Sequence, residues 1–294
     1  MLISEASKLA NLTKKAINYY IEQNLIFPDS LENGYRHFSD KDVERLKEIS
    51  VLRKLGLSIE EIKMICTDDA SSAIQKISVR KELSLQRDKA QKAILDKLSY
   101  GYSFAEIHKE LEAIEQSATV TEKLLEAFPG YYGRFICLHF ARFLDEPIET
   151  SEQQAAYEEI IAFLDNAPSI DFPIEIQSFL VENTKHINTD DIHDMIENTK
   201  KSLEDPQKFL SGNRERLEQY LEYRQSEEYK QSPVYHMQKI LKEYNRTSGY
   251  NDVFIPAMKK LSSSYAKYYE QMENANEKLL LQYPEIAALN KLNE

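Results

Sequence analysis

Residues 71–100 contain neither glycine nor proline and carry charges of both signs, which predicts one long helix. Gly101 follows directly and is a typical residue just past a helix C-terminus. We interpret this segment as a pairing helix between an N-terminal domain, residues 1–70, and a C-terminal domain, residues 101–294. Its seam is not a clean heptad repeat, because Val79, Leu83, Ala90 and Ile94 align only roughly and Gln86 and Lys97 interrupt them.

The composition is that of an ordinary globular protein, with 42% hydrophobic and 29% charged residues among 294. Only 7 glycines are present and the C-terminal region shows no convincing β alternation, so we expect a mainly α fold. No apolar run approaches the length of a membrane span and no signal-peptide pattern is found, so we expect a cytoplasmic protein without membrane contact. Cys66 and Cys137 are too few for a disulfide framework or a cysteine-rich metal site.

The acidic residues are unevenly distributed along the chain. The formal net charge is −12, yet residues 1–65 carry ten Lys and Arg and ten Asp and Glu. The excess of acid therefore lies beyond residue 65, and DNA would repel that part of the chain. A neutral N-terminal segment can still bind phosphates if its cations share one face.

The N-terminal segment has the pattern of a winged helix-turn-helix. Asn33-Gly34 separates two short β-prone runs and predicts a hairpin with a type I′ turn, which needs a positive φ at both central residues. Thr13, Ser39 and Ser58 are typical N-cap residues, and Ser58 opens a capping box. The predicted helices cover residues 3–10, 13–23, 39–56 and 58–65.

The second of these helices has two different faces. At about 100° per residue, its apolar residues fall on one arc, which can pack on the first helix. The opposite arc offers cations, an amide and a phenol, which suit phosphate and base-edge contacts in a DNA groove. The apolar arc holds Thr13, Ala16, Ile17 and Tyr20, and the polar arc holds Lys14, Lys15, Asn18 and Tyr19.

Helical patterns continue through the C-terminal region, punctuated by prolines such as Pro168 and Pro206. Ser232-Pro233 fits an N-cap followed by proline at the first helical position. We therefore expect an all-helical C-terminal domain. The predicted helices cover residues 103–117, 120–128, 131–144, 151–165, 173–185, 190–203, 207–230, 233–247 and 252–281.

Residues 2–66 resemble the DNA-binding domain of the MerR family of transcription regulators. The matching stretches are ISEASKLANLTKKAINYYIEQNLIFPD and NGYRHFSDKDVERLKEISVLRKLGLSIEEIKMI. The resemblance implies a homodimer that binds pseudo-palindromic, double-stranded promoter DNA through the second helix and the wing. It also implies pairing through the long helix, realignment of promoter elements for RNA polymerase, and an effector-sensing C-terminal region.

The resemblance also assigns residues to the interface with DNA. It implies recognition-helix roles for Lys15 and Tyr19-Tyr20, a wing role for Tyr35-Arg36, and a phosphate contact for Arg53. Asn18 stands where the family usually has Arg, so a cationic contact is lost and the preferred operator is open. Tyr20 is as well interpreted as a core residue, and Lys14 as a solvated surface residue. The full set of DNA-binding candidates is Thr13, Lys14, Lys15, Asn18, Tyr19, Tyr20, Tyr35, Arg36 and Arg53.

Metal sensing is not expected of the C-terminal region. Metal sensors of the family use cysteines at the end of the pairing helix and just after it, whereas Cys66 precedes that helix and the next thiol is Cys137. The acidic run from Asp190 to Asp194, with His193, is better explained as the first turn of a helix. We expect no metal site and no cofactor.

Aromatic residues concentrate in the C-terminal region, where fifteen of the 18 tyrosines and ten of the 12 phenylalanines follow residue 99. Such a region could bind a lipophilic or cationic small molecule in an aromatic pocket. An aromatic stripe at helical spacing is also typical of a packed core. The candidate ligand-binding residues are Tyr131, Tyr132, Phe135, His139 and Phe140.

Two other functions of the C-terminal region compete with small-molecule binding. Catalysis is not expected, because the chain lacks a nucleophile elbow, a phosphate-binding loop and a zinc-protease helix. A protein-interaction or assembly scaffold is a real alternative, because residues 207–247 and 252–281 form long charged helical runs. The sequence therefore predicts a promoter-binding regulator that responds to a small molecule or recruits a protein.

Overall fold

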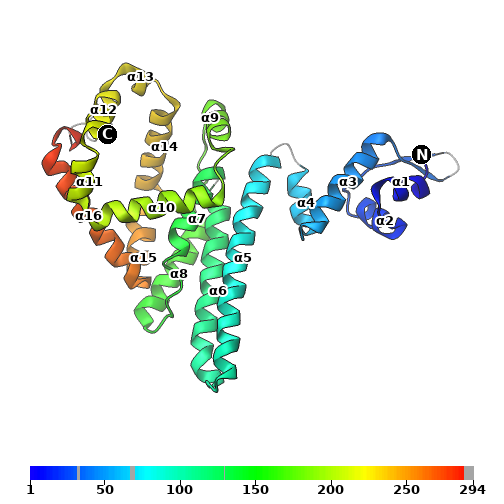
Figure 1. The fold of residues 1–294 in the computed structure, drawn as a ribbon, viewed down its shortest axis with the longest axis horizontal. Helices are drawn as coiled ribbons and strands as arrows, with labels where there is room; N and C mark the ends of the chain where they lie inside the picture. The colour runs from blue at the N-terminus through cyan, green and yellow to red at the C-terminus, as the bar shows by residue number, and fades with distance from the viewer. Residues whose placement is uncertain (32–33, 67–69, 129, 288–294) are drawn as a thin grey trace. The chain divides into compact units, whose positions relative to one another are not determined.

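The structure is a computed structural model that describes residues 1–31, 34–66, 70–128 and 130–287. The chain forms two compact units, Met1–Ile77 and Ser78–Glu294, and the boundary between them falls within the long helix α5 (Ala70–Ser99), shown in cyan in Figure 1. Each unit has its own hydrophobic core and is described by itself.

Unit 1 is a helix-turn-helix followed by a short hairpin and two more helices. The N-caps predicted from the sequence are confirmed, because the side chains of Thr13, Ser39 and Ser58 each accept a hydrogen bond from a backbone N–H three residues later. The elements are α1 (Ile3–Ala10), α2 (Lys14–Glu22), β1 (Asp29–Ser30), β2 (Arg36–His37), α3 (Asp40–Lys54) and α4 (Ile59–Ile65).

The wing is the antiparallel pair of β1 and β2, in which Ser30 lies opposite Arg36. Gly34 has a φ of +79°, a left-handed conformation that glycine adopts without strain. Asn33, the other residue of the predicted type I′ turn, lies outside the described residues. The base of the wing is fixed by Phe38, which is fully buried in the core of unit 1.

Every regular element among the described residues of unit 2 is a helix, and the mainly α fold class predicted from the sequence is confirmed. Besides the rest of α5 it contains α6 (Phe104–Ala127), α7 (Gly130–Ala141), α8 (Ser151–Asn166), α9 (Ile174–Thr184), α10 (Thr189–Glu204), α11 (Pro206–Gly212), α12 (Arg214–Gln225), α13 (Glu227–Lys230), α14 (Pro233–Thr247), the π-helix η1 (Tyr250–Phe254), α15 (Ile255–Leu261) and α16 (Ser263–Gln282).

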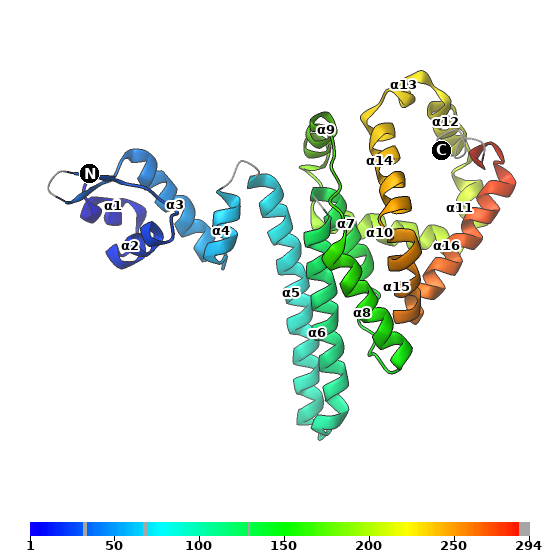
Figure 2. The same cartoon turned by 180° about the vertical axis from the view of Figure 1, so that it is seen from behind.

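Helices α5 and α6 lie side by side and run in opposite directions (Figures 1 and 2). Ion pairs connect them: Arg80 binds Glu122, and the Lys97 ammonium lies 2.6 Å from the Glu110 carboxylate. Gly101 turns the chain between the helices with a φ of +93°. These contacts fix one face of α5 against α6 within unit 2.

The core of unit 2 is built largely from aromatic rings. Phe140 of α7 meets Phe254 of η1 edge to face, with ring centroids 5.0 Å apart. Helix α7 comes unusually close to the end of α6, because a Cβ at Gly133 would lie 2.1 Å from the carbonyl oxygen of Phe128. Any side chain at position 133 would therefore move α7 away from this core.

Some of the predicted helices differ in extent from those of the structure. Residues 103–117 and 120–128 form the single helix α6, in which the Thr121 hydroxyl bonds back to the backbone instead of ending the helix. Residues 207–230 are divided into α11, α12 and α13, since Ser226 caps a new helix. The predicted helix 252–281 is broken at Ser262, where Glu146 hydrogen-bonds to the start of α16. Within the described residues, no helix combines the length and apolar character needed to cross a bilayer.

Candidate nucleic-acid interface

Helix α2 presents its polar arc to solvent. Ile17 is fully buried and Tyr20 is only 6% exposed, so the apolar arc forms part of the core of unit 1. Lys14, Lys15 and Tyr19 are exposed. The structure therefore favours the core interpretation of Tyr20, whose ring packs at 6.1 Å from that of Tyr19. The cations and the Tyr19 phenol remain available to a phosphate backbone.

The wing is tied to α2 by a hydrogen bond between two of the candidate residues. Arg36 is exposed on β2, and its Nη1 donates to Oδ1 of Asn18, which is half-buried on α2, at 3.0 Å. The residue before it, Tyr35, is 65% exposed. This bond orients the Arg36 guanidinium next to the polar arc of α2 and leaves its other N–H groups for an acceptor such as phosphate.

Arg53 lies in the last turn of α3 and is exposed. Its Nη1 donates to the carbonyl oxygen of Leu57, so part of the guanidinium stabilises the turn between α3 and α4. An arginine has five N–H donors, and a phosphate contact needs only one or two of them. The structural role and the predicted phosphate role of Arg53 are therefore compatible.

Lys63 is a cation that the sequence patterns do not point to. It is exposed near the end of α4, and its Nζ donates to Oε1 of Gln23, the C-cap residue of α2, at 3.3 Å. The two residues are 40 positions apart in sequence. Only the tertiary fold places this charge beside the end of α2.

The thiol of Cys66 lies at the end of α4, in unit 1. Burial raises the pKa of Cys66, although the Arg45 charge acts in the opposite direction. The protonated thiol is a poor metal ligand. Among the described residues, no group of three or more His, Cys, Asp and Glu side chains is placed to hold a metal ion.

The candidate ligand-binding residues all lie on α7, but they differ in burial. Phe140 is 2% exposed and belongs to the core, whereas Tyr131, Tyr132, Phe135 and His139 are half-buried. Burial, reinforced by the Arg142 charge, lowers the pKa of His139 to about 4, so its ring is neutral at neutral pH. It stacks on Phe135, with ring centroids 6.2 Å apart. Tyr131, Phe135 and His139 form a ladder of rings along one side of α7, whereas Tyr132 packs on Phe128.

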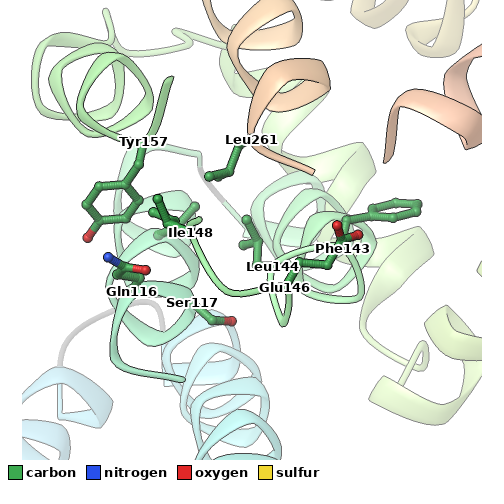
Figure 3. Close-up of a pocket in the computed structure, with 9 residues that line it drawn as sticks. Gln116, Ser117, Phe143, Leu144, Glu146, Ile148, Tyr157 and Leu261 are labelled. Carbon is green, nitrogen blue, oxygen red and sulfur yellow. The ribbon is translucent and has the colours of Figure 1, made fainter. Parts of the chain in front are cut away.

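A small pocket opens near the C-terminal end of α7 (Figure 3). Its volume of about 10 Å³ accommodates roughly one water molecule. None of the five candidate ligand-binding residues contributes to its wall. The residues that line it are Gln116, Ser117, Val120, Phe143, Leu144, Glu146, Ile148, Tyr157 and Leu261.

Comparison with known proteins agrees with the arrangement of unit 1. Residues 1–69 match the model of the MerR HTH family regulatory proteins. The chain is 35% identical over 92 residues to the HTH-type transcriptional regulator HmrR of Rhizobium leguminosarum bv. viciae, an alignment that covers 30% of this chain and 71% of the relative.

Other relatives share a smaller part of their length. The heavy metal-dependent transcription regulator 2 of Rhizobium meliloti is 34% identical over 93 residues, which is 30% of this chain and 63% of the relative. The multidrug-efflux transporter 2 regulator of Bacillus subtilis is 32% identical over 124 residues, which is 42% of this chain and 40% of the relative. The chain thus spans less than two thirds of both proteins.

Proposed function

The chain belongs to the MerR family of helix-turn-helix regulatory proteins, and we propose that it binds promoter DNA as a homodimer and responds to a small-molecule effector. Residues 1–70 would read DNA, residues 71–100 would pair two chains, and residues 101–294 would bind the effector. The observation that carries the DNA-binding role is the hydrogen bond from Arg36 to Asn18, which holds the wing arginine next to the exposed lysines of α2.

Pairing through α5 is supported by its exposed apolar residues. Val79 and Ile94 are buried, yet Leu85 is 49% and Leu95 is 64% exposed on the same helix. Exposed leucines on a long helix can be covered by the same helix of a second chain. RNA polymerase would be the further partner at the promoter, where the dimer would change the geometry of the DNA.

The DNA-binding proposal is tested with the full chain and a fragment of its own upstream promoter. We expect sequence-selective binding that weakens steeply as salt rises, because lysine and arginine contacts release counterions. Arg36→Ala should lower affinity about tenfold or more and reduce the slope of log K against log salt by about one.

Arg246→Ala is the matched control, because Arg246 is 70% exposed in unit 2 and pairs with Glu243 there. It should leave promoter affinity unchanged. Absence of salt-dependent, sequence-selective binding by the full chain would overturn the DNA-binding proposal.

A scaffold function of unit 2 is the second candidate. Tyr220 and Tyr223 of α12 are 47% and 40% exposed, and exposed tyrosines are common in protein interfaces. Capture of one stable partner that is lost in Tyr220→Ala, with no compound altering promoter output, would favour the scaffold over the sensor. Retention of the partner by that variant would count against it.

A further inference from the structure

Arg134 is a buried arginine on α7, and its residue is only 3% exposed. Its Nη1 donates a hydrogen bond of 3.1 Å to the carbonyl oxygen of Ile187, between α9 and α10. Its Nε and Nη2 are also buried, and neither has a hydrogen-bond partner among the described residues. A buried charged donor normally has a partner, because an uncompensated charge away from water is costly.

The positions of the two unpartnered nitrogens indicate which kind of hydrogen-bond acceptor would fit them. Nε and Nη2 lie on one edge of the planar guanidinium, and this edge matches the two oxygens of a carboxylate. Arg80 of this chain uses the same pair of nitrogens: its Nε lies 2.8 and 3.0 Å from the two carboxylate oxygens of Glu122, and its Nη2 bonds to one of them. In the described part of the chain no carboxylate takes that place at Arg134.

Aromatic rings of α7 lie near the Arg134 guanidinium. The ring centroid of Tyr131 is 5.6 Å from the Arg134 guanidinium carbon. The Phe135 ring follows one helical turn later, 6.4 Å from that of Tyr131, and His139 extends the ladder by another turn. A flat apolar ring joined to a carboxylate could therefore lie against Tyr131 and Phe135 while its oxygens meet Arg134.

We propose that Arg134 is the recognition site for the carboxylate of a small aromatic acid, whose ring packs on Tyr131 and Phe135. The role of this site as the effector site of the regulator rests on the function proposed above. The proposal assigns an anionic ligand in place of the lipophilic or cationic one expected from the sequence. Binding would supply the charge that the buried guanidinium lacks within the described protein.

Tyr131 controls access to the guanidinium. Its hydroxyl is 3.4 Å from the sulfur of Met195 on α10, and this contact joins α7 to α10. A thioether is a weak acceptor and methionine side chains repack easily, so this contact opens at low cost. Ligand entry moves the Tyr131 ring away from Met195 and changes the contact between α7 and α10.

The test uses the full chain without DNA, so that a failure of the effector site is distinguishable from a failure of DNA binding. The probes are benzoate, its neutral analogue benzamide, and inorganic phosphate, each titrated at neutral pH while the melting temperature is followed. We expect benzoate to raise the melting temperature progressively, and benzamide and phosphate to have no effect, because only benzoate combines a carboxylate with a ring.

Arg134→Met should abolish the response to benzoate, and Arg134→Lys, which keeps the charge without the fork, should weaken it about tenfold or more. Arg246→Met, at an exposed arginine, should respond as the wild type does. If Arg134→Met does not fold, the comparison of benzoate with benzamide on the wild-type protein still tests whether a carboxylate is recognised. No response to benzoate, an equal response to benzamide, a response to phosphate alone, or a full response in either Arg134 variant overturns the proposal.

Tyr131→Phe tests the access step separately. It removes the hydroxyl contact with Met195 but keeps the ring, so benzoate should bind about two- to fivefold more tightly because the open form is more populated. Unchanged or weaker binding would overturn the role of Tyr131 in access.

Discussion

The two units differ in the burial of their polar side chains. In unit 1 the basic side chains of α2 and the wing are exposed. Ser50 is the only buried polar side chain among the described residues of this unit. In unit 2, buried polar atoms without a partner occur on Arg134, Arg142, Arg224, Tyr244 and Asn245, and none of those described occurs in unit 1. This difference supports the proposal that unit 1 acts at its surface on a polyanion and that unit 2 binds a small molecule in its interior.

The hydrophobic cores of the two units also differ in their aromatic content. Tyr20 and Phe38 are the aromatic residues buried in the described core of unit 1, which otherwise consists of aliphatic side chains. In unit 2, the ring of Phe254 contacts three other rings, those of Phe140, Phe163 and Tyr250. An aromatic core loses much packing when one ring is removed, because a buried ring such as that of Phe254 contacts several others.

The largest difference between the two units is expected from Phe254→Ala. Phe254 is fully buried, so its truncation should destabilise unit 2 by ~3–5 kcal/mol. Calorimetry of the full chain should show a lower unfolding temperature for unit 2 and an unchanged one for unit 1. Phe104→Ala is the control, since Phe104 is 79% exposed. Equal losses in both units would contradict their independence.

A second prediction concerns Glu146, whose carboxylate accepts hydrogen bonds from Ser262 and from the backbone N–H groups of Ser263 and Ser264 at 3.2 and 3.0 Å. Burial opposes its ionisation, but the hydrogen bonds outweigh it and lower the pKa of Glu146 from 4.5 to about 2. The lower pKa in the folded state means that ionised Glu146 stabilises unit 2 above pH 4.5. This stabilisation is lost as the pH falls from 4.5 to about 2.

Glu146→Gln should therefore cost ~2 kcal/mol at neutral pH, which is less than the full pKa difference would give because solvent screens this partly exposed carboxylate. The variant should also remove the corresponding loss of stability on acidification. Denaturant unfolding of wild type and variant at a series of pH values measures both effects. Glu152→Gln, at an exposed glutamate of α8, is the control. A constant difference between wild type and Glu146→Gln down to pH 2 would argue against this assignment.

The smallest predicted effect is the coupling between Asn18 and Arg36. Because the 3.0 Å hydrogen bond orients the wing arginine, the two single alanine variants and the double variant should show non-additive losses of promoter affinity. We expect a coupling energy of ~0.5–1 kcal/mol. Additive losses would mean that the bond does not persist on DNA. Lys15→Ala combined with Arg36→Ala provides the additive reference.

Much of unit 1 follows from local sequence patterns. Thr13 and Ser58 cap their helices through residues three positions away, and Ile17 faces inward because helical spacing places it with other apolar residues. The two faces of α2 therefore follow from helical periodicity alone. The helices of unit 2 are also predictable in outline, but the break at Ser262 is not, because its cause is Glu146, 116 residues away.

The helical fold class, the caps and wing of unit 1, and the cations that face solvent on α2 can all be predicted from the sequence alone. These depend on interactions between residues a few positions apart, which a periodic pattern reveals. Only the tertiary structure showed that Asn18 holds Arg36 and that Arg134 is buried, with Ile187, 53 residues away, as its one hydrogen-bond acceptor among the described residues. An arginine in a helical pattern is typical of a surface position, and its burial is decided by what the rest of the chain packs around it.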